Sequence, residues 1–328
     1  MKRSLIALAT AAIAALALSG CTDSDAPAAA GSESPGTGEL QAVKVAALPI
    51  TETSAIWAGI EAGFFEEQGL DVEVLPAQGG AQAIPAMLSG DVQFAIGQPF
   101  GPFRADLQDL GVNIIGNFAS SHAEGPDVNA VVASAASGIT RPADLAGKRV
   151  SVNSLGAAGD VTIMAAVEAD GGDPSTIEFV EVAFPDAPAQ LAAGNIDAAW
   201  VPEPFVTQLV GGGDTLVVYP YQDVLPGLAT LTVMTTSQLM EEDPELVEAF
   251  STAMRETLDW ANDPANEDAV RQAIKDNLEL PDAVADSVPF PVYSFDLDRD
   301  TLEELAELAV DYGVLPSAPD FDRLIQQQ

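Results

Sequence analysis

Two stretches about a hundred residues apart share one pattern, and this pattern decides the fold. Residues 88–100 read LSGDVQFAIGQPF, and residues 192–205 read AAGNIDAAWVPEPF. Each stretch contains a glycine that ends a helix-like segment, a short apolar run typical of a buried strand, and then a Pro-Phe pair. A chain that repeats a strand together with its flanking turns is expected to contain two similar units.

The sequence around both stretches alternates between strand and helix patterns. The first unit is expected to have strands over 42–49, 70–77 and 92–97 and helices over 54–69 and 81–88. The second is expected to have strands over 148–153 and 177–185, helices over 157–172 and 186–194, and a third strand within 195–205. This βαβαβ order favours an α/β fold with mostly parallel sheets, repeated at an offset of about 105 residues.

The C-terminal third of the chain has mainly helical patterns. Asp243 and Pro244 suit the start of a helix, Asp263-Pro264 suits another, and 302–312 has the spacing of a third. We expect this region to pack on the first lobe, with the chain crossing between lobes near two valine-rich, strand-like segments, 128–135 and 215–233. The predicted organisation is therefore lobe I over 41–132 plus 226–328 and lobe II over 133–225.

Composition excludes several classes of function. The chain of 328 residues has 50 acidic and 12 basic residues, a net charge of -38, so it lacks the basic surface that nucleic acids require. The acidity is typical of a solvated surface. One histidine, His122, and one cysteine, Cys21, exclude an internal disulfide, a cysteine-based metal site and a Cys/His catalytic pair. No cofactor is expected.

The N-terminus has the features of an export signal. MKRS is a positive segment, and LIALATAAIAALAL is an apolar segment too short for a comfortable membrane span. LSGC then resembles a bacterial lipobox, which predicts a signal peptide over 1–20 and lipidation of Cys21. The alternative is an ordinary secretory signal that happens to end near a cysteine. Residues 21–40 have the composition of a flexible linker, so the protein is expected to be lipid-anchored on the extracytoplasmic face of a bacterial membrane.

Four stretches together resemble a known group of proteins: GIEAGFFEEQGLDVEV (59–74), AMLSGDVQFAIGQP (86–99), DLAGKRVSV (144–152) and LAAGNIDAAWVPEPF (191–205). The resemblance is to the substrate-binding proteins of ABC importers for nitrate, sulfonates, taurine and thiamine-pyrimidine precursors. It implies a two-lobe type II periplasmic-binding fold, a ligand cleft between the lobes, and docking on a permease served by a separate ATPase. We expect a binding protein and no enzyme, because the chain lacks a catalytic motif and the lipid anchor favours capture outside the cell, and we expect a monomer.

Candidate ligand-binding residues follow the carboxyl ends of the predicted strands, where open α/β sheets bind ligands. They are Thr51, Ser54, Trp57, Gln78, Gln98, Asn153, Ser154, Gly156, Phe184, Trp200 and Glu203. Several have structural alternatives: Trp57 and Trp200 as core aromatics, Asn153 to Gly156 as a helix cap, and Glu203 as a cap or a hinge residue. A metal is not expected, because the EF-hand-like acids of 296–307 have Thr301 where the loop needs glycine.

Two ligand classes remain open at this point. A predicted helix N-terminus after Ser154 suits a sulfonate-like anion, which we favour. The aromatic residues Trp57, Phe184 and Trp200 suit a planar, pyrimidine-like heterocycle instead. A ligand sensor and a non-transport enzyme on the same fold are the alternatives of another class, although related pyrimidine-synthesis enzymes carry a cysteine-rich motif and reactive histidines that this chain lacks.

Overall fold

The computed structural model describes residues 39–77 and 80–326; for residues 80–82 it describes the backbone only. The segment Glu39–Gln328 forms a compact unit of its own, and it is the unit described below. The predicted signal peptide, the linker to residue 38, Cys21 and Gln78 lie outside the described residues. No helix in the described part of the chain has the length and apolar character needed to cross a bilayer.

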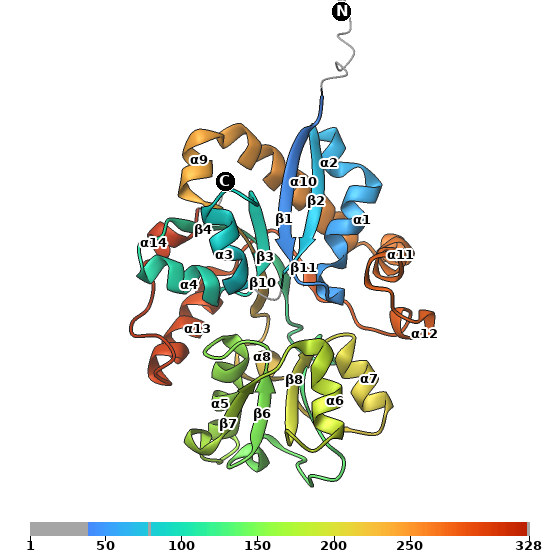
Figure 1. Ribbon diagram of the computed structural model, residues 1–328, viewed down its shortest axis with the longest axis vertical. Helices are drawn as coiled ribbons and strands as arrows, with labels where there is room; N and C mark the ends of the chain where they lie inside the picture. The colour runs from blue at the N-terminus through green and yellow to red at the C-terminus, as the bar shows by residue number, and fades with distance from the viewer. Residues whose placement is uncertain (1–38, 78–79, 327–328) are drawn as a thin grey trace, which may run out of the picture. The chain divides into compact units, whose positions relative to one another are not determined.

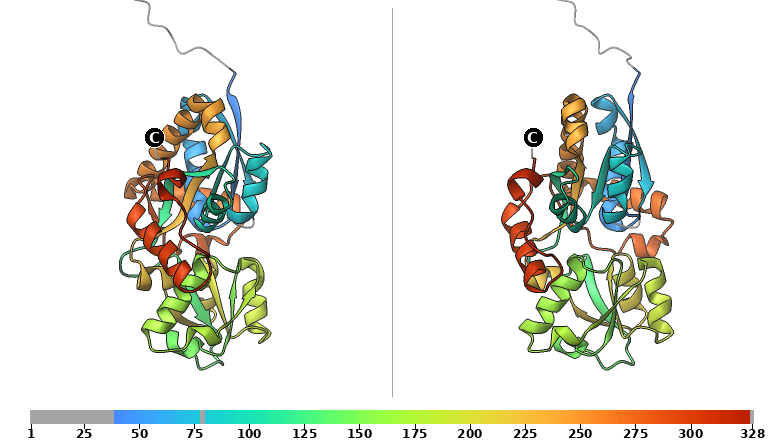
Figure 2. Two further views of the ribbon diagram at one scale, coloured as in Figure 1. Left: turned by 90° about the vertical axis from the view of Figure 1, so that its left-hand side faces the viewer. Right: turned by 60° about the vertical axis from the view of Figure 1, so that its left-hand side comes forward.

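The unit contains two sheets flanked by helices (Figures 1 and 2). The six-stranded sheet has the order β11-β4-β10-β3-β1-β2, and the five-stranded sheet has the order β7-β6-β8-β5-β9. The first comprises β1 (Gln41–Ala47), β2 (Leu70–Pro76), β3 (Phe94–Gly97), β4 (Val112–Ser120), β10 (Ala229–Thr236) and β11 (Val292–Tyr293). The second comprises β5 (Asn129–Ala133), β6 (Arg149–Val152), β7 (Glu178–Glu181), β8 (Ala198–Pro202) and β9 (Thr215–Val218). We call the six-stranded sheet with its helices the first lobe, and the five-stranded sheet with its helices the second lobe.

The sequence repeat corresponds to the same strand arrangement in both sheets. β1 pairs in parallel with β2 and β3, and β6 pairs in parallel with β7 and β8. An antiparallel strand then follows on the far side, β10 beside β3 and β5 beside β8. Each quoted stretch ends where a helix begins: α4 (Phe100–Leu107) and α7 (Phe205–Gly211) both start at the phenylalanine of the Pro-Phe pair. The mixed α/β fold with two similar sheets is confirmed.

Short helices connect the strands of each lobe. The first lobe has η1 (Thr51–Thr53), α1 (Ser54–Ala62), α2 (Phe64–Glu67), α3 (Gly80–Leu88) and α4. The second has η2 (Pro142–Leu145), α5 (Ala158–Ala169), η3 (Pro174–Thr176), η4 (Phe184–Asp186), α6 (Ala187–Ala192), α7 and α8 (Pro220–Val224). The single helix predicted over 54–69 is instead divided into α1 and α2, because Gly63 takes φ +92°, a left-handed conformation that ends α1.

The C-terminal helices are α9 (Ser237–Glu242), α10 (Pro244–Ala261), η5 (Pro264–Asn266), α11 (Glu267–Leu278), α12 (Asp282–Ala285), α13 (Arg299–Asp311) and α14 (Phe321–Leu324). In α10, Phe250 is fully buried, and its ring stacks on Phe94 of β3 with centroids 3.8 Å apart. α10 packs on α1 and α2, and α11 packs on α1, so both lie on the first lobe.

Two placements differ from the predicted organisation. β5 pairs with β8 and β9, so residues 129–132, assigned from the sequence to the first lobe, lie in the sheet of the second. α13 contacts α5 of the second lobe, and the Tyr312 hydroxyl donates a hydrogen bond to the Glu168 carboxylate. The C-terminal region therefore packs on both lobes, because a strand pattern or an amphipathic face does not specify which partner it will cover.

Candidate ligand-binding cavity

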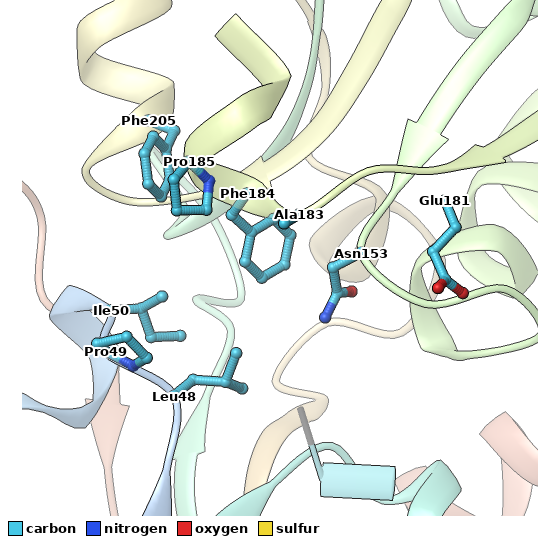
Figure 3. Close-up of a pocket in the computed structure, with 9 residues that line it drawn as sticks. All are labelled: Leu48, Pro49, Ile50, Asn153, Glu181, Ala183, Phe184, Pro185 and Phe205. Atoms are coloured by element: carbon cyan, nitrogen blue, oxygen red, sulfur yellow. The ribbon is translucent and has the colours of Figure 1, made fainter. Parts of the chain in front are cut away.

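A cavity of about 190 Å³ lies between the two lobes, at the carboxyl ends of strands from both sheets (Figure 3). The first lobe contributes the segment that follows β1, and the second lobe contributes the segments that follow β6 and β7 together with the start of α7. The lining residues are Leu48, Pro49, Ile50, Asn153, Glu181, Ala183, Phe184, Pro185 and Phe205. This is where ligands bind in open α/β sheets.

Local hydrogen bonds and aromatic packing hold the two walls. The Thr53 hydroxyl lies 2.6 Å from the Leu48 carbonyl oxygen and 2.8 Å from that of Ile50, which fixes the turn after β1. On the opposite wall, Phe184 packs against Phe205 and against Trp200, with ring centroids 6.5 Å and 5.6 Å apart. Figure 3 shows Phe184, Pro185 and Phe205 facing the Leu48–Ile50 turn. The cavity therefore has two rigid apolar walls.

Two polar side chains lie at one end of this cavity. Asn153 follows β6, and its Oδ1 is buried without a hydrogen-bond partner. Glu181 ends β7, and its carboxylate accepts a bond from the Leu155 amide at 3.3 Å. No lysine, arginine or histidine is among the described residues that line the cavity. The Asn153 Oδ1 is enclosed by the protein, so the group that Asn153 can offer to a polar group of a ligand is its Nδ2, a hydrogen-bond donor.

The N-terminus of α5 is occupied by a side chain of the protein itself. The Asp160 carboxylate accepts bonds from the backbone amides of Gly156 and Ala157 at 2.5 Å and 2.6 Å. The carbonyl of Gly156 accepts a bond from the guanidinium of Arg104, on α4 of the first lobe. Burial raises the pKa of Asp160, while these backbone bonds lower it. The amides of Gly156 and Ala157, directly before α5, are thus already bonded. From the 153–156 loop only Asn153 lines the cavity, and Ser154 is half-buried.

A second polar region lies deeper, where the lobes meet. Glu52 of η1 is 2% exposed, and its Oε1 accepts bonds from Asn129 Nδ2 at 3.2 Å and Thr230 Oγ1 at 2.8 Å. Burial raises the pKa of Glu52 to about 8; the two bonds lower it in part, and the nearby carboxylates of Asp127 and Glu203 raise it further. A small void of about 10 Å³ beside Glu52 is lined in part by Gln98, one of the predicted residues.

Glu203 belongs to this junction and not to the cavity wall. Its carboxylate accepts bonds from the backbone amide and the hydroxyl of Thr207, at 3.0 Å and 2.9 Å, so it caps the start of α7. Burial raises its pKa to about 7. Its backbone amide donates to the Val128 carbonyl at 2.8 Å, next to one of the two chain crossings. This geometry corresponds to the structural alternative considered from the sequence.

The other predicted residues lie outside the cavity lining. Trp200 is 1% exposed, packed between Phe184 and Tyr221 in the core of the second lobe, which corrects its expected place in the cleft. Trp57 is half-buried against the main core. Thr51 is buried with its hydroxyl unpaired, and Ser54 bonds to the Thr51 carbonyl at 2.6 Å.

Of the residues predicted from the sequence, Asn153 and Phe184 line this cavity, whereas most residues of its apolar wall were not among those predicted. Pro49 and Pro185 each follow a strand in a similar context, AALP and VAFP, so the repeat itself carried a usable signal for them. Phe205 is the second residue of the Pro-Phe pair that was already singled out. Glu52 lies within the short segment TET, which has no feature that separates it from a surface carboxylate.

Residues 50–267, more than half of the chain, match the family described as NMT1/THI5 like. The chain belongs to the NMT1/THI5-like family.

Among the described residues of this family member, no group of three or more acidic, histidine or cysteine side chains is placed to hold a metal ion.

Two curated proteins are similar in sequence to this family member. It is 24% identical to the formylaminopyrimidine-binding protein of Halalkalibacterium halodurans, covering 62% of this chain and 61% of that protein. It is 29% identical to the taurine-binding periplasmic protein of Escherichia coli, covering 57% of each. The chain thus spans about three-fifths of the length of the curated relatives it matches.

Solved structures share the fold over a larger part of the chain. The alkanesulfonate-binding protein SsuA of Xanthomonas axonopodis pv. citri is 15% identical with a TM-score of 0.75, covering 89% of this chain and all of that chain. This confirms the fold of type II periplasmic-binding proteins for the NMT1/THI5-like chain. A desulfurization enzyme has the same fold at 19% identity with a TM-score of 0.66, covering 88% of this chain and 97% of that chain, so the fold alone does not separate binding from catalysis.

Proposed function

We propose that this protein captures a small organic solute outside the cell and delivers it to the permease of an ABC importer. The observation that carries the proposal is the cavity whose two walls come from different lobes. A solute that touches both walls binds the closed arrangement better than an open one, so it shifts the population toward closure. The permease would recognise the closed form, and a separate ATPase subunit would hydrolyse ATP.

The movement would take place at the two chain crossings. One crossing lies between β4 and β5 and the other between β9 and β10, which places β5 in the moving second lobe. The crossings bond to each other where they leave the first lobe, because the Ser121 amide donates to the Leu228 carbonyl at 2.9 Å. We propose lobe boundaries within 121–128 and 219–228. The first replaces the boundary predicted after residue 132, and the second contains the boundary predicted after residue 225.

A sulfonate-like solute is the first candidate ligand. The similarity to taurine- and alkanesulfonate-binding proteins supports it. In this cavity the sulfonate would have to be received by the Asn153 amide and by solvent, since the amides of Gly156 and Ala157 are bonded to Asp160 and no residue of 154–160 lines the cavity.

A planar, pyrimidine-like heterocycle is the second candidate, and one specific observation favours it. The lining joins two aromatic rings, Phe184 and Phe205, with one amide and one carboxylate, and no lysine or arginine is among the described residues that line it. Such a lining can bury a flat ring and hydrogen-bond its edge. The similarity to a formylaminopyrimidine-binding protein agrees with this candidate.

A thermal-shift screen tests both candidates. The panel contains taurine, alkanesulfonates, nitrate, bicarbonate, pyrimidines and flavins. A ligand present at about 100 times its Kd adds roughly 2.7 kcal/mol of stability, which corresponds to a rise in melting temperature of several degrees. A panel without any hit, together with no co-purifying solute, would contradict both ligand classes. Turnover of any bound compound would contradict the proposed absence of catalysis.

The anchor is also part of the proposal. We propose that Cys21 carries the lipid that holds the protein at the extracytoplasmic face, and that the protein acts as a monomer. Replacement of Cys21 by serine should move the protein from the membrane fraction to the soluble fraction of cells. Unchanged membrane association of this variant would refute lipidation at Cys21.

A further inference from the structure

A second hollow, of about 410 Å³, adjoins the ligand cavity. It shares three lining residues with the cavity, Pro49, Pro185 and Phe205, so the two spaces are neighbours on either side of these residues. We call it the side groove. Its remaining lining comes from the start of α7 on one side and from the turn between α11 and α12 on the other: Pro204, Gln208, Asn277, Leu278, Glu279, Leu280, Pro281 and Val284.

We propose that the side groove holds an apolar arm of the transported solute, whose polar head lies at Asn153. The inference rests on the proposed function, and it specifies the class of substrate further. The solute would be an elongated amphiphile, with a small polar head in the cavity and an alkyl chain or a second flat ring in the groove. The compact solutes named for the curated relatives, such as taurine, would fill the cavity alone.

The size of the two spaces supports this division. Pockets for organic ligands typically measure about 300–1,000 Å³. The cavity at about 190 Å³ is below that range, whereas the adjoining groove at about 410 Å³ is within it. A solute confined to the cavity would leave the larger hollow next to it unfilled.

The chemistry of the groove favours an uncharged arm. Leu278, Leu280 and Val284 are half-buried, and they pack on a small separate core formed by Ile274, Ala285 and Val288. They line the groove with apolar surface, and their packing on this core supports the turn between α11 and α12. Glu279 is the single charged side chain among the described residues that line the groove, and no cation faces it there. An anionic arm is therefore disfavoured, and burial of apolar surface is the available source of affinity.

The groove also spans the two lobes. α11 packs on α1 of the first lobe, whereas Phe205 and Gln208 belong to α7 of the second. An arm in the groove would contact both lobes at a second place, beyond the contacts of the head. The arm would therefore stabilise the closed arrangement together with the head, and it would raise affinity without any additional charged contact.

The experiment is isothermal titration calorimetry of the full-length protein with two homologous series. One series is n-alkanesulfonates from ethane to decane, and the other is 4-aminopyrimidines with alkyl substituents of growing length. Each buried methylene should tighten Kd by roughly twofold to fourfold until the groove is filled, with an increasingly negative heat-capacity change. Affinity that does not depend on length would overturn the apolar arm and leave the proposed function standing. Failure of every compound to bind would overturn both.

Two substitutions on opposite walls of the side groove test whether the dependence of affinity on ligand length arises there. Leu280→Asp places a charge in the groove, and Gln208→Trp fills it from the exposed face of α7. Both should abolish the dependence on length while the shortest ligands bind with unchanged affinity. Leu110→Asp is the matched control, because Leu110 is 40% exposed and lines neither space. A length dependence that persists in both groove variants would refute the proposal.

Discussion

The buried carboxyl group of Glu52 predicts that stability falls as the pH rises through neutrality. Its pKa is raised from the ordinary value of 4.5 to about 8. Between these two values the folded protein binds one more proton at this site than the unfolded chain, so the free energy of unfolding decreases with increasing pH. Full linkage gives about 1.4 kcal/mol per pH unit, or a loss of about 2 kcal/mol between pH 6 and 7.5.

Replacement of Glu52 by glutamine should remove this dependence. The amide oxygen of glutamine can accept the bonds from Asn129 and Thr230 that Glu52 accepts, and it carries no charge at any pH. The variant should therefore equal or exceed the wild type in stability at pH 7.5, with a flatter profile below it. Glu203, whose pKa is raised to about 7, keeps a smaller slope of the same sign in the variant.

Urea unfolding at half-unit steps from pH 5.5 to 8.5 measures this effect. The exposed residue Glu67 provides a matched control, Glu67→Gln, which should reproduce the wild-type profile. If wild type and Glu52→Gln have parallel profiles, the carboxyl group of Glu52 is ionised in the folded protein at neutral pH, and the account of the lobe junction is wrong.

Three further substitutions test the packing and the cavity. In Gly59→Ala, the added Cβ would lie 2.3 Å from Thr257 Oγ1, so the α1–α10 contact must shift, and urea unfolding should show a loss of about 1–3 kcal/mol; unchanged stability would refute the close approach. Phe205→Ala removes a half-buried ring shared by the cavity and the side groove, and calorimetry should show affinity at least about tenfold lower, a loss near 1.4 kcal/mol; wild-type affinity would exclude Phe205 from the site. Asn153→Ala should weaken binding by roughly 2–10-fold through one lost hydrogen bond, and an unchanged Kd would show that no ligand atom reaches the Asn153 amide.

Much of the fold was predictable because the chain repeats a strand with its turns. Pro99-Phe100 and Pro204-Phe205 mark the same structural step in each lobe, from the end of a strand to the start of a helix. Glycine at a positive φ value explains why the helix predicted over 54–69 is two helices. Gly63 could be read from the sequence, but the residues around it also support one continuous helix.

The partners of each element were less predictable than the elements themselves. The segment NAVVA of β5 reads as a strand, yet its residues are all buried and lack the alternation that would indicate which sheet they join. The position of Trp200 was equally hard to predict. Every residue of β8 is buried, so the sequence has no alternation that would show whether Trp200 faces the cleft or the core.

The polar part of the site was predicted only in part. Asn153 was found because it directly follows a strand, whereas the anion site at the start of α5 was not confirmed, because Asp160 supplies the capping carboxylate from within the helix. A residue three positions inside a helix can reach back to its first amides, so an acidic residue there competes with a bound anion.

A crystal structure of the protein with the tightest ligand from the screen tests the central claim most directly. The account predicts solute density between the Leu48–Ile50 turn and Phe184, in contact with both lobes and with its polar end at Asn153. Solute bound on a single lobe, or with its polar end anywhere outside this cavity, would contradict this claim.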